Sequence, residues 1–162
     1  MKTILAPIDF SPITEQVIAA AADLALTLDG RVVLLHVVVL PPNPEDFALA
    51  LDRYSTLAET AEKSADTRLA ACQATLADRS VRGETMRLTG LPRRLIPATA
   101  EKVNADFIIM GSHGHTALHD LVVGSTTHAV VRAAVCPVII VPASAVAPVK
   151  QSAAPARQPA GA

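Results

Sequence analysis

The chain has 162 residues, about the length of one domain, which is enough to bury a single core; 51% of the residues are hydrophobic, but many of these are alanine. Its formal net charge of -1 leaves no electrostatic footprint for DNA, RNA or anionic lipid, and one Tyr, three Phe and no Trp give no platform for stacking bases. Composition therefore argues against a nucleic-acid-binding or membrane-surface protein.

The first part of the chain predicts a strand followed by a helix. Residues 2–8 form a short apolar run that predicts a buried strand, and this strand ends at Asp9. We expect the next helix to have Ser11 as its N-cap, Pro12 in its first turn and Gly30 beyond its last turn. Apolar residues at helical spacing predict its buried face: Ile13, Val17, Ala20, Ala21, Leu24 and Leu28.

The middle of the chain predicts two more strands around a long helix. Residues 31–39 are a continuous β-branched run, typical of a strand covered on both faces. After the proline-rich loop at 40–46, a helix is predicted from about Phe47 to Ala77. Its apolar residues are separated by three or four: Leu51, Tyr54, Ala58, Ala61, Ala65, Leu69, Cys72 and Leu76. Residues 81–88 alternate in polarity, which predicts a third strand.

The last third continues the alternation. A helix is predicted over residues 91–105, with Pro92 near its start and Pro97 inside it, where a proline can distort a helix. The remaining expected elements are a buried strand at 106–110, a helix from Ser125 to Ala134 and a strand at 137–142 bracketed by prolines. Residues 143–162 are rich in Pro and Ala and lack an apolar period, so we expect a disordered tail.

Alternating strands and helices predict an α/β fold: an open five-stranded parallel sheet with helices on both faces, of Rossmann-like type. Such sheets bind ligands outside the carboxyl ends of their strands, where the strand order reverses. Asp9 ends the first strand and Gly111 ends the fourth. If these two strands are neighbours, both residues lie at one crevice.

The segment after the fourth strand has the features of an anion site. Gly111 and Gly114 allow the backbone to turn sharply and bring its amides close to a ligand. Gly124, Ser125 and Thr126 then open a helix, whose first N–H groups lack internal partners and whose dipole is positive there. This arrangement suits a phosphate, although glycines in strand-to-helix loops also occur without one. It is neither a Walker loop nor a dinucleotide fingerprint.

The spacing Gly111-x2-Gly114-x9-Gly124-Ser125 resembles the nucleotide loop of the universal stress protein family, G-x2-G-x9-G-S/T. Further stretches resemble the family's first strand, second strand, entry to the third helix and last strand: residues 4–11, 34–38, 89–96 and 136–142. The resemblance covers residues 1–142, which would form one domain. It implies the strand order 3-2-1-4-5, in which the first and fourth strands are adjacent.

The resemblance also implies ATP as the ligand, with Mg²⁺ as a candidate companion ion. By position, the adenosine end would be formed by Ala6, Pro7 and Asp9, the adenine edge by the backbone of Val37, the ribose and α-phosphate contacts by Met110 and Gly111, and the phosphate contacts by Gly114, Gly124, Ser125 and Thr126. Asp9 has a second interpretation, because a carboxylate after a first strand can cap the following helix.

Histidines cluster around the glycine segment: His113, His115, His119 and His128. Imidazoles can bind zinc, but this spacing has no helical or hairpin logic and no cysteine lies nearby, so we favour solvent-facing or phosphate-adjacent histidines. The resemblance implies that many relatives carry Lys or Arg where this chain has His115, so that a permanent charge is replaced by a titratable one. His115 is therefore included in the site, and nucleotide affinity is expected to rise as the pH drops. His36, within a strand, is predicted to be a hydrogen-bonded core residue.

Three functions remain open. The favoured one is a universal stress protein that binds ATP as a stress-response or signalling module with slow or no hydrolysis, because the glycine segment lacks Lys and Arg and offers only Asp120 as a carboxylate. The alternatives are a hydrolase or nucleotidyl-transfer enzyme in the same crevice, and a nucleotide-free stress protein that acts through protein contacts. A receiver domain is disfavoured, because no acceptor aspartate follows the third strand.

Assembly and location are also predicted. Residues 137–142 form an apolar strand at a sheet edge, which invites pairing with a second copy, and relatives are similar in forming homodimers there. Residues 1–12 are not a secretory signal, and no run approaches the ~18 apolar residues that span a bilayer. Cys72 and Cys136 make no disulfide framework and are expected in the core. We therefore expect a soluble cytoplasmic protein with no nucleic-acid or membrane partner and with unknown protein partners.

Overall fold

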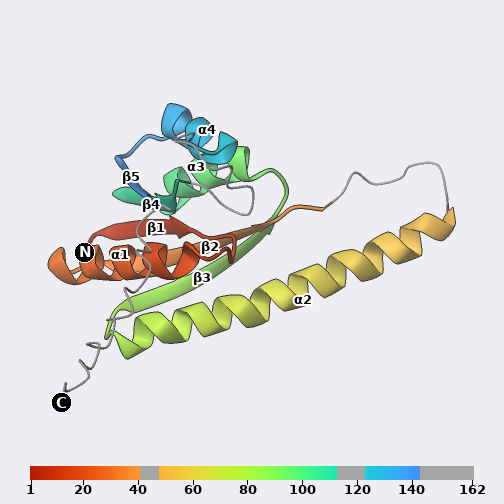
Figure 1. The fold of residues 1–162 in the computed structure, drawn as a ribbon, viewed down its shortest axis with the longest axis horizontal. Helices are drawn as coiled ribbons and strands as arrows, with labels where there is room; N and C mark the ends of the chain where they lie inside the picture. The colour runs from red at the N-terminus through yellow and green to blue at the C-terminus, as the bar shows by residue number, and fades with distance from the viewer. Residues whose placement is uncertain (41–47, 113–122, 143–162) are drawn as a thin grey trace, which may run out of the picture.

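The computed structural model describes residues 1–40, 48–112 and 123–142, and gives only the backbone for residues 48–53. Strands and helices alternate in the predicted order (Figure 1). The strands are β1 (Thr3–Pro7), β2 (Arg31–Val38), β3 (Arg82–Thr89), β4 (Phe107–Gly111) and β5 (Val138–Val141). The helices are α1 (Thr14–Thr27), α2 (Ala48–Asp78), α3 (Pro92–Lys102) and α4 (Ser125–Ala133).

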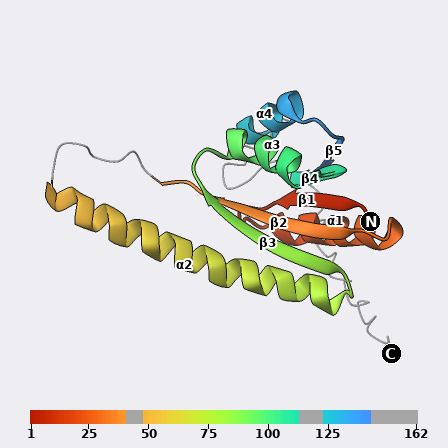
Figure 2. The same ribbon diagram turned by 180° about the vertical axis from the view of Figure 1, so that it is seen from behind.

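The strands form one parallel sheet in the order β3-β2-β1-β4-β5. This topology confirms both the predicted α/β fold and the adjacency of the first and fourth strands. Seen from behind, the same sheet separates α2 from α3 and α4 (Figure 2). Because all five strands are parallel, the carboxyl ends of β1 and β4 lie at the same edge.

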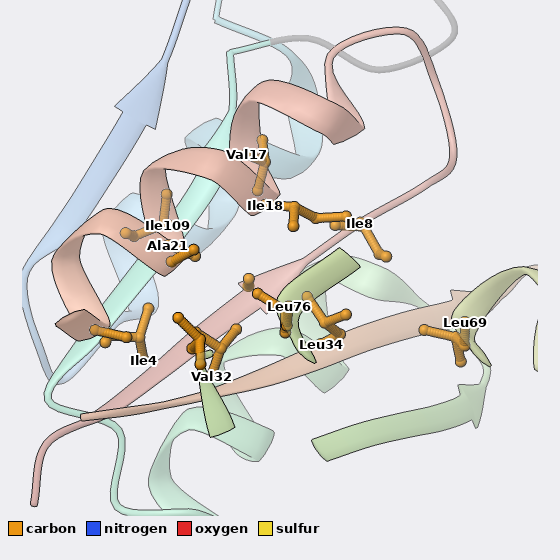
Figure 3. Packing of buried hydrophobic residues seen from close by; sticks show 14 of the residues in the cluster. Ile4, Ile8, Val17, Ile18, Ala21, Val32, Leu34, Leu69, Leu76 and Ile109 are labelled. Atoms are coloured by element: carbon orange, nitrogen blue, oxygen red, sulfur yellow. The ribbon is translucent and has the colours of Figure 1, made fainter. Parts of the chain in front are cut away.

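Alternate residues of the central strands enter two cores, one on each face of the sheet. On one face, Ile4, Val32 and Ile109 pack with residues of α1 and α2 (Figure 3). On the other, Leu5 and Ile108 pack with residues of α3 and α4. This period of two is what a strand covered on both sides requires, and it explains the unbroken apolar runs in β2 and β4.

Helix α1 begins later than predicted. Its N-cap is Ile13 and no side chain of the described residues caps it, so the prediction that Ser11 is the N-cap is wrong. At the other end Gly30 lies beyond the last turn, as predicted, but the left-handed residue there is Asp29, with φ of 46°. Gly30 is instead required by close approach, because a Cβ there would lie 2.8 Å from the Lys2 carbonyl oxygen.

The buried face of α1 is also rotated from the predicted one. It consists of Thr14, Val17, Ile18, Ala21, Ala22 and Ala25. Ala20 and Leu24 are partly buried against the same core. The small residues Ala22 and Ala25 let the helix lie close to the sheet, and they carry too weak an apolar signal to be chosen from the sequence.

Helix α2 packs on the sheet through its C-terminal half, and its N-terminal end extends beyond the sheet (Figure 1). The predicted stripe is confirmed where side chains are described: Ala65, Leu69 and Leu76 are buried, and Tyr54, Ala58, Ala61 and Cys72 are half-buried. A Cβ at Gly83 on β3 would lie 2.7 Å from Leu76 Cδ1, so the glycine allows this close approach. The predicted loop and tail, residues 41–47 and 143–162, lie outside the described residues.

Candidate nucleotide crevice

A cavity of about 230 Å³ opens at the carboxyl edge of β1, β2 and β4. The sheet edge contributes one group of lining residues: Pro7, Ile8, Asp9, Leu35, Val37, Val39, Met110 and Gly111. Helix α1, with the residue before it, contributes Ile13, Thr14 and Val17, and the other face contributes Pro92, Ile96, Thr126 and Thr127. The cavity is therefore a crevice between α1 on one side and α3 and α4 on the other, at the point where the strand order reverses.

Asp9 organises the turn between β1 and α1. Its Oδ1 accepts a hydrogen bond from the Ser11 amide at 3.0 Å and another from Ser11 Oγ at 2.5 Å. The Ser11 carbonyl in turn accepts from the Thr14 amide at 2.9 Å. Asp9 thus has a structural role in this turn, although it does not cap α1 as the second interpretation proposed, and it also lines the crevice. Ser11 serves this turn instead of capping α1.

Phe10, the next residue, fastens the same turn to the rest of the fold. Its backbone is left-handed with φ of 62°, which is unusual for a bulky side chain. The centroid of the Phe10 ring lies 4.3 Å from that of the His36 ring. The guanidinium of Arg68, on α2, lies 4.2 Å from the Phe10 centroid. Arg68 also donates a hydrogen bond to the Phe10 carbonyl at 3.1 Å. These contacts hold Asp9 in place from two directions.

His36 is hydrogen-bonded, as the sequence predicted, but it is half-buried and does not lie in the core. Its Nδ1 lies 2.9 Å from the Ile8 carbonyl oxygen, which can only accept, so the neutral ring carries its proton on Nδ1. Burial lowers the pKa of His36 below its usual value, against the opposing effects of the Ile8 carbonyl and of Asp9. The Arg68 charge lowers the pKa further. His36 is therefore kept neutral beside the crevice.

The chain on either side of the glycine segment is fixed at the sheet edge. The Ser112 amide donates to the Val141 carbonyl at 2.8 Å, and the Gly124 amide donates to the Ser112 carbonyl at 2.9 Å. Thr127 Oγ1 donates to the Gly111 carbonyl at 3.0 Å. The start of α4 is thereby held directly beside the end of β4.

Gly124 is the N-cap of α4, as predicted, and no side chain of the described residues caps it. The first bond within the helix runs from the His128 amide to the Gly124 carbonyl at 2.9 Å. The amides of Ser125, Thr126 and Thr127 precede that bond and have no partner within the helix. Together with the helix dipole they give the α4 end of the crevice a partial positive charge without a cationic side chain.

The predicted site residues fall into three groups. Those that line the crevice are Pro7, Asp9, Val37, Met110, Gly111 and Thr126. Ala6, Gly124 and Ser125 lie beside it without lining it: Ala6 is completely buried in the core, and Ser125 is exposed at the start of α4. Gly114 and His115 lie outside the described residues, as do His113, His119 and Asp120.

Several lining residues were not predicted, and most are apolar. Ile13 and Val17 were expected in the core, and Leu35 and Ile96 were expected in a strand and a helix without a link to the site. The sequence carries a usable signal for two other lining residues, Ile8 and Val39, because each directly follows a strand and so shares the sheet edge. Thr14 and Thr127 lacked even that signal, since a threonine in the first turn of a helix has no distinguishing context.

Asp9 is the only ionisable side chain among the lining residues that the structure describes. In the same part of the chain, no group of three or more His, Cys, Asp and Glu side chains could hold a metal ion. No helix within residues 1–40, 48–112 and 123–142 is long and apolar enough to cross a membrane. The crevice is thus an apolar cleft with one carboxylate near it and a helix N-terminus at one end.

A parallel sheet of this order with a crevice at its carboxyl edge defines a small Rossmann-like α/β protein. The model of the universal stress protein family matches residues 1–142, and the chain belongs to that family. The resemblance inferred from the glycine spacing is therefore confirmed at the level of the family.

Known relatives agree over most of the chain. Universal stress protein A homolog 1 of Coxiella burnetii is 33% identical over 140 residues, which cover 86% of this chain and 95% of the relative. The solved structure of MJ0577, a universal stress protein of Methanocaldococcus jannaschii, is 28% identical with a TM-score of 0.76 and covers 87% of this chain and 95% of its own.

Two more distant structures share the fold and contain nucleotides. A universal stress protein of Archaeoglobus fulgidus, solved in complex with dAMP, is 21% identical with a TM-score of 0.66, and covers 86% of this chain and 97% of its own. Another universal stress protein, solved in complex with cAMP, is 18% identical with a TM-score of 0.59, and covers 86% of this chain and 95% of its own.

Proposed function

We propose that this protein binds an adenine nucleotide, ATP, in the crevice between α1 and α4, and acts as a stress-response or signalling module. The observation that carries the proposal is the uncapped N-terminus of α4 beside Gly111, at the mouth of an apolar cavity. An apolar cleft suits a base, and free helix amides suit a phosphate. The dAMP and cAMP complexes of related folds support the choice of an adenine nucleotide.

The volume of the crevice indicates which part of the nucleotide it can enclose. Its volume of about 230 Å³ is below the roughly 300–1,000 Å³ of pockets that enclose a whole drug-sized ligand. The enclosed part would then hold the nucleoside, with Val37 at the adenine edge, Pro7 and Asp9 at the adenosine end and Met110 near the ribose. The phosphates would lie outside it, along the first turn of α4 and the glycine segment.

Slow or absent hydrolysis follows from the charges available. Phosphoryl transfer needs cationic groups or metal ions that stabilise the charge of the transferred phosphate. The lining residues that the structure describes include no Lys or Arg, and residues 111–127 contain none in the sequence. Any Mg²⁺ would arrive with ATP. The bound nucleotide would therefore act as a signal and would not be rapidly consumed.

One substitution tests the location of the phosphates. Thr126→Glu puts a carboxylate in the first turn of α4, where an acidic side chain favours the helix and preserves the fold. Like-charge repulsion at this distance should raise the Kd for ATP at least about ten-fold. Binding of adenosine, which has no phosphate, should change little.

The matched control is His128→Glu, which makes a similar change at an exposed position of the same helix outside the crevice lining. Both variants and the wild-type protein would be titrated with ATP and with adenosine by calorimetry. Equal ATP affinity in the wild type and in Thr126→Glu would contradict the proposed phosphate position. Absence of ATP binding by the wild type would contradict the proposed function itself.

A homodimer through residues 137–142 is part of the proposal. β5 lies at the edge of the described sheet, and Ile139 and Ile140 are 38% and 37% exposed there. Pairing of two such edges would bury both side chains and satisfy free backbone groups. Light scattering should give a dimer mass for the wild type and a monomer mass for Ile140→Lys, whereas Leu57→Lys on α2 should remain a dimer. A monomeric wild type at micromolar concentration would refute this part.

A further inference from the structure

Thr14, the first residue of α1, carries a buried hydroxyl that has no hydrogen-bond partner in the described part of the chain. The residue is only 7% exposed. Leaving a buried hydroxyl unpaired is costly, and such groups in native proteins usually have a partner. The missing partner of Thr14 therefore requires an explanation.

The neighbouring hydroxyls show that this situation is not general. Ser11 Oγ donates to Asp9, and Thr127 Oγ1 donates to the Gly111 carbonyl. Both of these side chains are more than nine-tenths buried and both are engaged within the protein. Thr14 is as buried as they are, yet its hydroxyl is available.

The position of Thr14 indicates what the hydroxyl serves. It lines the crevice on the α1 side together with Ile13 and Val17, which cannot form hydrogen bonds. Thr126 and Thr127 lie on the α4 side, across the end of the sheet. Thr14 also borders a second cavity, of about 380 Å³, between α1 and α2, which is lined by Glu15 and Arg79 among others. The crevice is the site with an independent case for a ligand.

We infer that the Thr14 hydroxyl forms a hydrogen bond with the nucleoside part of the bound nucleotide and contributes to its recognition. This inference rests on the proposed function. The assignment to the nucleoside follows from the geometry, because α4 supplies the phosphate end and α1 forms the opposite wall. Thr14 is thus a binding residue that supplements the glycine segment and Asp9.

The test uses three variants of the full chain. Thr14→Val replaces the hydroxyl with a methyl group of similar size, Thr14→Ser retains the hydroxyl, and Thr27→Val makes the same change at the exposed end of α1. Calorimetric Kd values would be measured for ATP, ADP and AMP with each variant. Thermal unfolding of the nucleotide-free proteins would be measured in parallel.

We expect Thr14→Val to raise the Kd for ATP, ADP and AMP by the same factor, about three- to ten-fold, which is typical for the loss of one hydrogen bond. Thr14→Ser should remain within about two-fold of the wild type, and Thr27→Val should be unchanged. The nucleotide-free Thr14→Val protein should melt at or above the wild-type temperature, because an unpaired buried hydroxyl has been removed.

Wild-type affinity in Thr14→Val would overturn the inference alone, and so would a loss of affinity confined to ATP, which would place the contact at the phosphates. A wild-type protein that binds none of the three nucleotides would overturn the proposed function and this inference with it. A large drop in the melting temperature of nucleotide-free Thr14→Val would also contradict the inference about Thr14, since the hydroxyl would then have a partner inside the protein.

Discussion

Arg68 should hold the turn that carries Asp9, and Arg68→Met tests this directly. The substitution retains a flexible apolar chain but removes the guanidinium that lies 4.2 Å from the Phe10 ring centroid and donates to the Phe10 carbonyl at 3.1 Å. The contact matters because Phe10 is left-handed, a conformation that costs an L-residue roughly 1–2 kcal/mol. Without Arg68, less interaction energy remains to offset that cost.

The magnitude follows from the two lost contacts. A cation–π contact at an exposed site contributes about 0.5–1 kcal/mol, and an exposed hydrogen bond contributes a similar amount, since solvent competes for it. The sum is about 1–2 kcal/mol. For a chain of this length the melting temperature should fall by roughly 3–6 °C. If the turn opens locally, hydrogen exchange at the Ser11 amide, which is bonded to Asp9, should accelerate about 5–30-fold.

Lys63→Met is the matched control, because Lys63 is an exposed cation on the same helix, α2. Thermal unfolding and amide exchange of both variants would be compared with the wild type. The reasoning would be refuted if Arg68→Met melted with the wild type and Ser11 exchanged at an unchanged rate. Equal destabilisation by Lys63→Met would refute it too, because the effect would then reflect charge on α2 and not the contact with Phe10.

Two further predictions concern the supporting fold. Leu76→Ala should reduce the free energy of unfolding, measured by urea denaturation, by about 2–5 kcal/mol, since Leu76 is completely buried against Gly83. Leu57 is half-exposed on the same helix, so Leu57→Ala should change this free energy by no more than about 0.5 kcal/mol. Similar losses in the two variants would contradict the packing. The pKa of His36 is lower in the folded protein than in the unfolded chain, so as the pH falls the unfolded chain binds the proton first. Neutral His36 therefore contributes fully to the stability of the fold above about pH 6.5, and this contribution is lost as the pH falls toward the folded pKa. His36→Asn should remove that part of the pH dependence between pH 7.5 and 5.5, and an unchanged slope would count against it.

Much of the fold was accessible from the sequence because its signals are local and strong. Long β-branched runs, helical spacing on α2 and prolines beside β5 identified the elements, and strand–helix alternation predicted the parallel sheet. The adjacency of β1 and β4 is different in kind. No local pattern determines it, and it came from the resemblance to a family before the sheet order confirmed it.

The candidate site was predicted less completely, for physical reasons. Gly111 and Thr126 carry a spacing that can be read along the chain, whereas Thr14 matters only because its hydroxyl is unpaired in three dimensions. The prediction that Ser11 caps α1 was wrong for a similar reason. Ser11 and Asp9 are both good capping residues, and the sequence does not show that they bond to each other instead. Competition between adjacent polar groups is decided by backbone geometry.

The most direct test of a nucleotide crevice at the carboxyl edge is an NMR titration of ¹⁵N-labelled protein with ATP. The account predicts saturable shifts of the amides of Val37, Gly111 and Thr126, with little change at Gly30 and Ser80 at the opposite end of the sheet. No saturable shifts, or shifts concentrated around Gly30 and Ser80, would contradict it.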